Sequence, residues 1–306
     1  MPLHSEIAKV LAALPPAPHG PLDPATMRAA EEQDVVPADE RLPLHAVEEM
    51  TARTPSGEVP VRVYTPAEAD SHGLLVYFHG GAFFLGSLDT HDHIARSPAA
   101  ETGLKVVSVG YRLAPEAAFP AGLDDCYAVL RWTAEHGETL AWDRTTLAVA
   151  GDSSGGTYAA VAARAHDDGF HHITHQILYY PSLDLDFDTD RYPSRREDAV
   201  GHGLETAGLK PFNAFYFGSG ADPADPLVSP IKRTDLGGLP PALVVTGECD
   251  PLRDEGELYA RRIWEAGGKA TVSRYAGAGH GFVQHFSWIP EYHQVFAETS
   301  AFLGRR

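Results

Sequence analysis

Residues 151–155, with the sequence GDSSG, have the types and spacing that place a nucleophilic serine on a sharp turn between a strand and a helix. Such a turn strains the backbone of the serine, and glycines two residues before and after it avoid collisions with the neighbouring strand and helix. The flanks agree, because residues 147–150 are typical of a buried strand and residues 159–165 of a helix with small side chains. The sequence predicts that Ser153 is a catalytic nucleophile rather than part of an ordinary glycine-rich turn.

A second glycine-rich segment, His79-Gly80-Gly81-Ala82, follows an apolar stretch that has the pattern of a strand. Acyl transfer to a serine builds negative charge on the carbonyl oxygen of the substrate, and N–H groups aimed at that oxygen stabilise it. We expect the backbone N–H groups of Gly81, Ala82 and Ser154 to be those donors. Gly80 and His79 are expected to support the loop, so His79 is not our candidate for the base. A plain turn is the alternative, which the serine motif downstream disfavours.

The general base must be chosen among 16 histidines. In hydrolases with this type of serine turn the chain order is nucleophile, then acid, then histidine, so the base follows Ser153. His280 lies in the glycine-rich stretch GAGHGF at 277–282, just after the last predicted strand, where a loop lets an imidazole reach the serine. His285 and His293 have helix-like neighbours and are interpreted as surface or packing residues. The sequence therefore favours His280.

The acid that orients this histidine is expected at the end of an earlier strand. The apolar stretch 242–246 leads into GECDPLRDE at 247–255, in which Asp250 lies at the strand end, before a proline that suits a helix start. Asp254 is the rival, but it falls where the next helix begins and suits a first-turn charge. We expect Asp250 to fix the imidazole tautomer and to stabilise the imidazolium that forms during the reaction.

Two groups of histidines raise the question of a metal site. His91 and His93 form an H-x-H pair, and His171, His172 and His175 form a cluster. No cysteine or carboxylate spacing completes a known metal motif around them, so we expect exposed loop histidines instead. The sequence contains no dinucleotide fingerprint and no phosphate loop, and the proposed chemistry requires neither a cofactor nor a metal.

The composition narrows the function classes. The chain has 306 residues, 43% of them hydrophobic, which is enough for one large core, and its net charge of −18 disfavours binding to nucleic acid or anionic lipid. Cys126 and Cys249 are interpreted as buried side chains, which agrees with a reducing compartment. The apolar run at 7–14 is too short for a membrane span and lacks the pattern of a signal peptide. We expect a cytoplasmic protein.

Strand-like and helix-like segments alternate from about residue 46, which favours a mostly parallel sheet with helices on both faces. The predicted strands are 59–64, 74–78, 106–111, 147–150, 176–180, 242–246 and 271–275. The predicted helices are 123–135, 154–166, 255–266 and 292–303.

Two segments have no strand pattern, namely 1–45 and 186–225. The second contains an aromatic, helix-like stretch at 210–217. We expect both to form a cap over the carboxyl ends of the strands, where such sheets bind ligands, although ordinary surface excursions are the alternative. The chain is then one domain of 1–306, with a catalytic core made of residues 46–185 and 226–306.

The chain resembles the bacterial hormone-sensitive-lipase-like esterases in motifs spread from residue 77 to residue 282. These motifs are HGG at 79–81 with Phe83 and Gly86, THD at 90–92, YRLAPE at 111–116 with FPA at 119–121, GDSSGG at 151–156, DPLRDE at 250–255 and GHGF at 279–282. The YRLAPE and DPLRDE runs are long enough to be specific.

The resemblance implies an α/β-hydrolase fold with a mostly parallel eight-stranded sheet, and a cap built from the N-terminal helices and an insertion after the sixth strand. It implies a serine carboxylesterase acting on short- to medium-chain acyl esters, often dimeric through an edge strand. Carried over by position, the triad is Ser153, Asp250 and His280. Two positions depart from the usual pattern: Ala82 replaces a glycine, which bears on acyl-chain preference, and Ser154 replaces a common alanine.

Two other functions remain open. One is a related acyl hydrolase or acyltransferase that acts on lactones, thioesters or amides, because these reactions share the acyl-enzyme step. The other is a ligand receptor, since plant relatives of the fold bind a hormone after losing a triad member. The presence of both Ser153 and His280 disfavours the receptor.

Overall fold

The computed structural model describes residues 2–14, 22–67, 72–163, 165, 168–187 and 191–304. Its centre is one eight-stranded sheet with the order β1-β2-β4-β3-β5-β6-β7-β8. From β4 through β8 in this order all neighbours are parallel, whereas β2 pairs antiparallel with both β1 and β4. The strands are β1 Ala46–Thr54, β2 Gly57–Thr65, β3 His72–Phe78, β4 Lys105–Val109, β5 Trp142–Asp152, β6 His175–Tyr179, β7 Ala242–Cys249 and β8 Ala270–Gly279.

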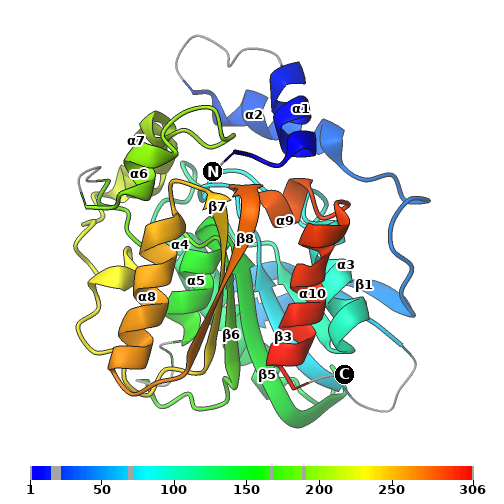
Figure 1. Cartoon of the computed structure of the whole chain (residues 1–306). Helices are drawn as coiled ribbons and strands as arrows, with labels where there is room; N and C mark the ends of the chain where they lie inside the picture. Colours follow the sequence, from blue (N-terminus) through cyan, green and yellow to red (C-terminus); the bar gives the residue numbers. More distant parts are fainter. Residues whose placement is uncertain are drawn as a thin grey trace.

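Helices cover both faces of this sheet (Figure 1), with α4, α5 and α8 on one face and α3 and α10 on the other. The α-helices are α1 Ser5–Ala13, α2 Pro24–Glu31, α3 Asp92–Thr102, α4 Ala121–Glu135, α5 Ser154–Ala163, α6 Ser194–Glu197, α7 Thr206–Asn213, α8 Arg253–Glu265, α9 Phe282–His285 and α10 Pro290–Phe302. Short 3-10 turns lie at Glu32–Asp34, Tyr216–Ser219 and Pro230–Lys232.

The central strands are buried on both faces, because successive side chains of a strand point to opposite sides. Along β3, Leu74 and Val76 pack in the core beneath α4 and α5, whereas Leu75 and Tyr77 pack in the core beneath α3 and α10. The same alternation continues in β5. This two-sided burial explains why these strands are continuous apolar runs in the sequence, and it confirms the α/β-hydrolase architecture.

Helices α1 and α2 lie above the sheet, at the end where the parallel strands finish, and α6 and α7 lie beside them (Figure 1). Asp23 caps α2 by accepting a hydrogen bond from the amide of Thr26 at 3.3 Å, and Pro24 occupies the first helical position. The predicted helix at 210–217 is instead α7, at Thr206–Asn213, followed by a 3-10 turn.

All seven predicted strands are present, and β4 ends two residues earlier than expected. Strand β1 was not predicted, because it is an edge strand with mostly exposed, polar residues that lack an apolar run. The predicted end of helix 154–166 falls on residues outside those described. In the described part of the chain, no helix is both long enough and apolar enough to cross a bilayer.

The prediction of exposed loop histidines is wrong for His91, His93 and His175. His91 caps α3 and is buried, and His93 lies in the first turn of that helix and is partly buried. His93 Nε2 bonds the carbonyl oxygen of Gln284 at 2.6 Å. Helix α3 packs against the sheet, and this packing buries a segment whose sequence looks polar. His171 and His172 are exposed, as expected, and His175 is partly buried at the start of β6.

Candidate active site

Ser153 is the single residue between the end of β5 and the start of α5, and it has a positive φ of 52°. A non-glycine residue in this region is strained, and it persists only when the surroundings hold it. The glycines on each side make the turn possible. A Cβ atom on Gly151 would collide with the carbonyl oxygen of Gly155, and one on Gly155 would collide with that of Phe78. The local geometry is therefore that of a nucleophile elbow.

The structure brings Ser153, His280 and Asp250 into one hydrogen-bonded chain. His280 Nε2 lies 2.9 Å from Ser153 Oγ, and His280 Nδ1 lies 2.8 Å from Asp250 Oδ2. Asp250 follows β7 and is fully buried, and its other oxygen accepts the amide of Leu252 at 2.8 Å. Strands β7 and β8 are neighbours, so the residues that follow them meet at the same edge of the sheet.

The charge of Asp250 changes the proton affinity of His280. Burial alone would lower the pKa of the imidazole, but the negative charge of Asp250 and its hydrogen bond outweigh burial and raise that pKa above the ordinary value. The carboxylate bond to Nδ1 also leaves Nε2 facing the serine as the proton acceptor. This arrangement suits a general base.

The rival residues occupy other environments. Asp254 lies in the first turn of α8 and accepts bonds from the amide of Ser194 at 2.8 Å and from Arg253 Nε at 2.9 Å. His293 is exposed and lies 3.8 Å from Glu101. His285 is also exposed, but it lines the pocket around Ser153.

The oxyanion loop, residues 79–87, has an unusual backbone. Gly81, Ala82 and Phe83 have φ values of 111°, 48° and 67°. The amides of Phe84 and Leu85 both bond the carbonyl oxygen of Gly81, at 3.0 and 2.8 Å. Among the described residues, the amides of Gly81 and Ala82 have no hydrogen-bond acceptor.

Two further groups complete the surroundings of this loop. The amide of Ser154 is the first of α5, and the first amides of a helix have no partner within it. His79 stacks on Tyr111 with ring centroids 4.2 Å apart, and its Nδ1 bonds the carbonyl oxygen of Gly80 at 2.8 Å. Burial, reinforced by the nearby His91, lowers the pKa of His79 to about 3, so this ring is neutral at pH 7.

A pocket of about 650 Å³ opens beside Ser153 and His280. Its walls are mostly apolar and come from four regions: the N-terminal helices, the oxyanion loop, the segment 186–225, and the region around α9. The lining residues are Ile7, Val10, Leu11, Leu14, Met27, Glu31, Gly81, Ala82, Phe84, Leu85, Ser153, Tyr180, His202, Gly203, Leu204, Phe212, His280, Gly281, Gln284, His285, Phe286 and Trp288.

Comparisons with known proteins identify the family of the chain. The family described as the alpha/beta hydrolase fold matches residues 75–284. Carboxylesterase NlhH of Mycobacterium tuberculosis is 39% identical over 282 residues, which cover 87% of each chain. An ethyl acetate hydrolase of Pseudomonas putida is 35% identical, over 86% of this chain and 84% of the relative.

A solved structure gives the same result. The hyperthermophilic esterase of the archaeon Pyrobaculum calidifontis superposes with a TM-score of 0.89 at 38% identity, covering 98% of this chain and 97% of that one. This chain belongs to the hormone-sensitive-lipase-like carboxylesterases. The fold and the family expected from the sequence motifs are therefore confirmed.

The structure of this carboxylesterase adds a residue that the sequence reasoning left without a role. Asp152 is buried, and its carboxylate accepts the hydroxyl of Tyr77 and, at 2.9 Å, the amide of Gly80. Burial would raise the pKa of this carboxyl, but the nearby His91 and the bond from Tyr77 outweigh it and lower the pKa. An ionised Asp152 thus ties the oxyanion loop to the nucleophile elbow.

One cluster in the described part of the carboxylesterase has the residue types of a metal site. The ligand atoms of Asp198, His202 and Cys249 lie within 4.8 Å of one another. Arg253 Nη1 already donates to Asp198 at 3.2 Å, and His202 Nδ1 lies 3.2 Å from the other oxygen of Asp198. The positive charge of the Arg253 guanidinium would repel a metal ion at this place. We therefore interpret the cluster as an ion-pair network that holds residues 198–202 against β7.

Proposed function

We propose that this carboxylesterase hydrolyses short- to medium-chain acyl esters through an acyl-enzyme formed on Ser153. The observation that carries the proposal is the continuous hydrogen-bonded chain from Ser153 through His280 to Asp250. His280 acts as base and then as acid, and Asp250 holds its tautomer and stabilises the imidazolium.

The reaction has two halves. Ser153 Oγ attacks the ester carbonyl carbon while His280 Nε2 takes the hydroxyl proton, and the resulting oxyanion is stabilised by the amides of Gly81, Ala82 and Ser154. The tetrahedral intermediate expels the alkoxide, which receives the proton from His280 and leaves as the alcohol. A water molecule then attacks the acyl carbon while His280 takes one of its protons, which gives a second tetrahedral intermediate. The bond from the acyl carbon to Ser153 Oγ breaks, Oγ receives the proton from His280, and the carboxylic acid leaves.

The segments 1–45 and 186–225 serve in this proposal as the cap that selects the substrate. Apolar side chains from both segments line the pocket, including Leu11 of α1 and Phe212 of α7. Tyr216 stacks on Phe83 of the oxyanion loop with centroids 3.9 Å apart. The size and the apolar lining of the pocket favour uncharged acyl chains of short to medium length.

The test uses purified protein and p-nitrophenyl butyrate. Ser153→Ala is expected to lower kcat by roughly 10⁴-fold or more, and a fluorophosphonate probe should label the wild type at Ser153 but not this variant. Near-wild-type turnover of Ser153→Ala rules out the acyl-enzyme, and failure to label the wild type favours the receptor. A profile over esters, thioesters, lactones and amides separates the related acyl hydrolases, and the ester series should have the highest kcat/KM.

The cytoplasm is the proposed compartment, because Cys126 and Cys249 are both buried and neither forms a disulfide.

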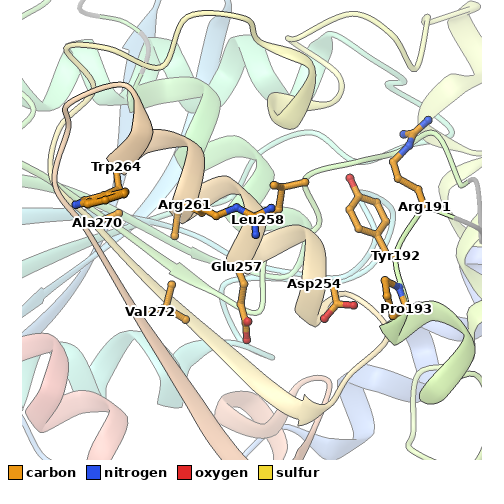
Figure 2. Close-up of a pocket in the computed structure, with 11 residues that line it drawn as sticks. Arg191, Tyr192, Pro193, Asp254, Glu257, Leu258, Arg261, Trp264, Ala270 and Val272 are labelled. Carbon is orange, nitrogen blue, oxygen red and sulfur yellow. The ribbon is translucent and has the colours of Figure 1, made fainter.

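We also propose a homodimer formed through β8, which lies at one edge of the sheet, so that its first part, residues 270–275, has no further strand beside it in the described part of the chain. Beside it, a groove of about 610 Å³ is lined by residues of α8, β8 and the segment 191–193 (Figure 2), among them Trp264 and Val272, which are 69% and 43% exposed. Sedimentation equilibrium should give a dimer for the wild type and a monomer for Val272→Lys. A monomeric wild type at micromolar concentration contradicts the dimer.

A further inference from the structure

Helix α2 contacts the oxyanion loop along one face. Arg28 and Glu31 belong to this helix, and Glu32 follows it directly. Their spacing of three and four residues puts the three side chains on the same side of the helix. Each of them bonds a different residue near the end of the oxyanion loop.

Arg28 joins this loop to a second one. Its Nε donates to the carbonyl oxygen of Phe84 at 2.7 Å, and its Nη2 donates to that of Ala114 at 2.6 Å. The same guanidinium forms a two-pronged ion pair with Glu116, with both N–O distances 2.9 Å. Four bonds to three residues leave the planar guanidinium little freedom, so the position of Phe84 is fixed relative to α2.

The two acidic residues hold the next part of the loop. Glu31 Oε2 accepts the amide of Gly86 at 2.8 Å, and Glu32 Oε1 accepts the hydroxyl of Ser87 at 2.8 Å. Gly86 has a φ of 86°, and a Cβ atom there would collide with the ring of His79. The loop is thus packed from below by its own residues and held from above by α2.

The contacts with α2 bear on the strained part of the loop. Ala82 and Phe83 have positive φ, a conformation that non-glycine residues keep only when the surroundings enforce it. The carbonyl oxygen of Gly81 accepts the amide of Phe84, so the peptide planes before Phe84 move with it. Arg28 holds the other side of this residue through its carbonyl oxygen. The carbonyl group of Gly81 shares a peptide plane with the amide of Ala82, so a shift of Phe84 would turn that amide. Gly86, which Glu31 holds, packs against the carbonyl oxygen of Gly80, and this carbonyl shares its peptide plane with the amide of Gly81.

We propose that α2 positions the oxyanion hole, with Arg28 and Glu31 as its positioning residues. They hold Phe84 and Gly86 in place, so that the amides of Gly81 and Ala82 point at the developing oxyanion. The inference rests on the acyl-enzyme function proposed above. It differs from the view that α2 only forms a wall of the pocket. Arg28 does not line the pocket, so an effect of Arg28 on catalysis would not come from contact with the substrate, whereas Met27 and Glu31 do line it.

The two views predict different kinetics. A group that only shapes the pocket changes KM and chain-length preference, whereas a group that aims the oxyanion donors acts in the transition state and changes kcat. Loss of one such donor outright typically lowers kcat by about 10²–10³-fold, so misplacement should have a smaller effect. An alkyl boronic acid, which forms a tetrahedral adduct on a serine, reports the same geometry without turnover.

The first experiment compares Arg28→Ala with the wild type on p-nitrophenyl butyrate, with rates expressed per active site titrated by diethyl p-nitrophenyl phosphate. We expect kcat to fall about 10- to 100-fold, KM to stay within about twofold, and boronic acid affinity to fall with kcat. Met27→Ala is the matched control on the same helix. It should alter KM and chain-length preference while boronic acid affinity follows substrate affinity.

A second pair of variants guards against a merely structural effect. Glu31→Gln keeps an oxygen that can accept the Gly86 amide and should retain near-wild-type kcat, whereas Glu31→Ala should behave like Arg28→Ala. If kcat per titrated site is unchanged in Arg28→Ala, the inference is overturned. This holds even if the melting temperature of the variant falls. Ser153→Ala distinguishes the two proposals. Near-wild-type activity of that variant would contradict the acyl-enzyme function, independently of the result for Arg28→Ala.

Discussion

The hydroxyl oxygen of Ser154 accepts a hydrogen bond from the backbone amide of Phe83, at 3.3 Å. This bond joins the first residue of α5 to the residue that follows Ala82 in the oxyanion loop. Ser154 and Ala82 are the two positions at which the chain departs from the usual motifs of its family. The serine hydroxyl thus holds the neighbour of a strained alanine, so the two departures are physically linked.

We predict that these two positions are energetically coupled. Ser154→Ala should lower kcat/KM about fivefold, since one hydrogen bond is worth about 1 kcal/mol. Glycine adopts the backbone conformation of Ala82 without strain, so the same substitution in an Ala82→Gly background should have a smaller effect. A double-mutant cycle of kcat/KM measures the coupling, expected at about 0.5–1 kcal/mol. Additive effects contradict the link.

The pH dependence should follow His280. The protonated imidazole cannot accept the proton of Ser153, so kcat/KM rises with pH through the pKa of His280 in the free enzyme. Asp250 raises that pKa, so the acidic limb should lie above the ordinary value of 6.5. In Asp250→Asn the limb should move to lower pH, and kcat should fall by about 10³–10⁴-fold. A full pH–rate profile of both proteins tests this, and an unmoved limb argues against the role of Asp250.

Gly155→Ala should unfold the elbow rather than merely slow the reaction. Its Cβ atom would collide with the backbone carbonyl of Phe78, which has no room to shift within β3. We expect a loss of about 3 kcal/mol or more in the free energy of unfolding, measured by urea denaturation. Gly103→Ala is the control for backbone strain without a collision, because Gly103 has a positive φ but faces open space, and it should lose only about 1–2 kcal/mol. Equal losses in both variants contradict a steric cause.

The buried ion pair between Arg195 and Glu255 should be important for stability. The two side chains lie 2.5 Å apart, both fully buried, and Glu255 also accepts the amide of Leu183 at 2.8 Å. Glu255→Gln leaves a buried guanidinium without a counter-charge, so we expect a loss of about 3–5 kcal/mol. The exposed pair Arg131–Glu135, at 3.9 Å, provides the control, and Glu135→Gln should change stability by less than about 0.5 kcal/mol. Guanidinium denaturation of both variants decides between these expectations.

The sequence predicted the central strands, because these depend on local patterns. It also pointed to Ser153, Asp250 and His280, which lie in one hydrogen-bonded chain, because local motifs and chain order single them out. Ser153 has its glycines beside it, and Asp250 and His280 each follow a strand with a clear apolar run. The glycines of residues 79–82 also led to the prediction of an oxyanion loop there. Its backbone angles follow from packing and could not be derived from the sequence.

Contacts between distant segments were not predictable in the same way. Whether Arg28 meets Phe84 depends on where α2 lies over the sheet, and no spacing in the sequence encodes that position. The burial of His91 depends on the packing of α3, and the role of Asp152 depends on the closeness of Gly80. Strand β1 lacks an apolar run because one edge of the sheet faces solvent.

The residues that form or position the proposed active site come from nearly the whole length of the chain, since Arg28 lies near the start and His280 lies in the last tenth. A nascent polypeptide on the ribosome therefore contains the serine long before it contains the base. Until the ribosome has synthesised residue 280 and β8 has joined β7, Ser153 has no proton acceptor. Ester hydrolysis can thus report that both ends of the molecule have folded. A truncated chain, or one stalled on the ribosome before residue 280, would have no esterase activity.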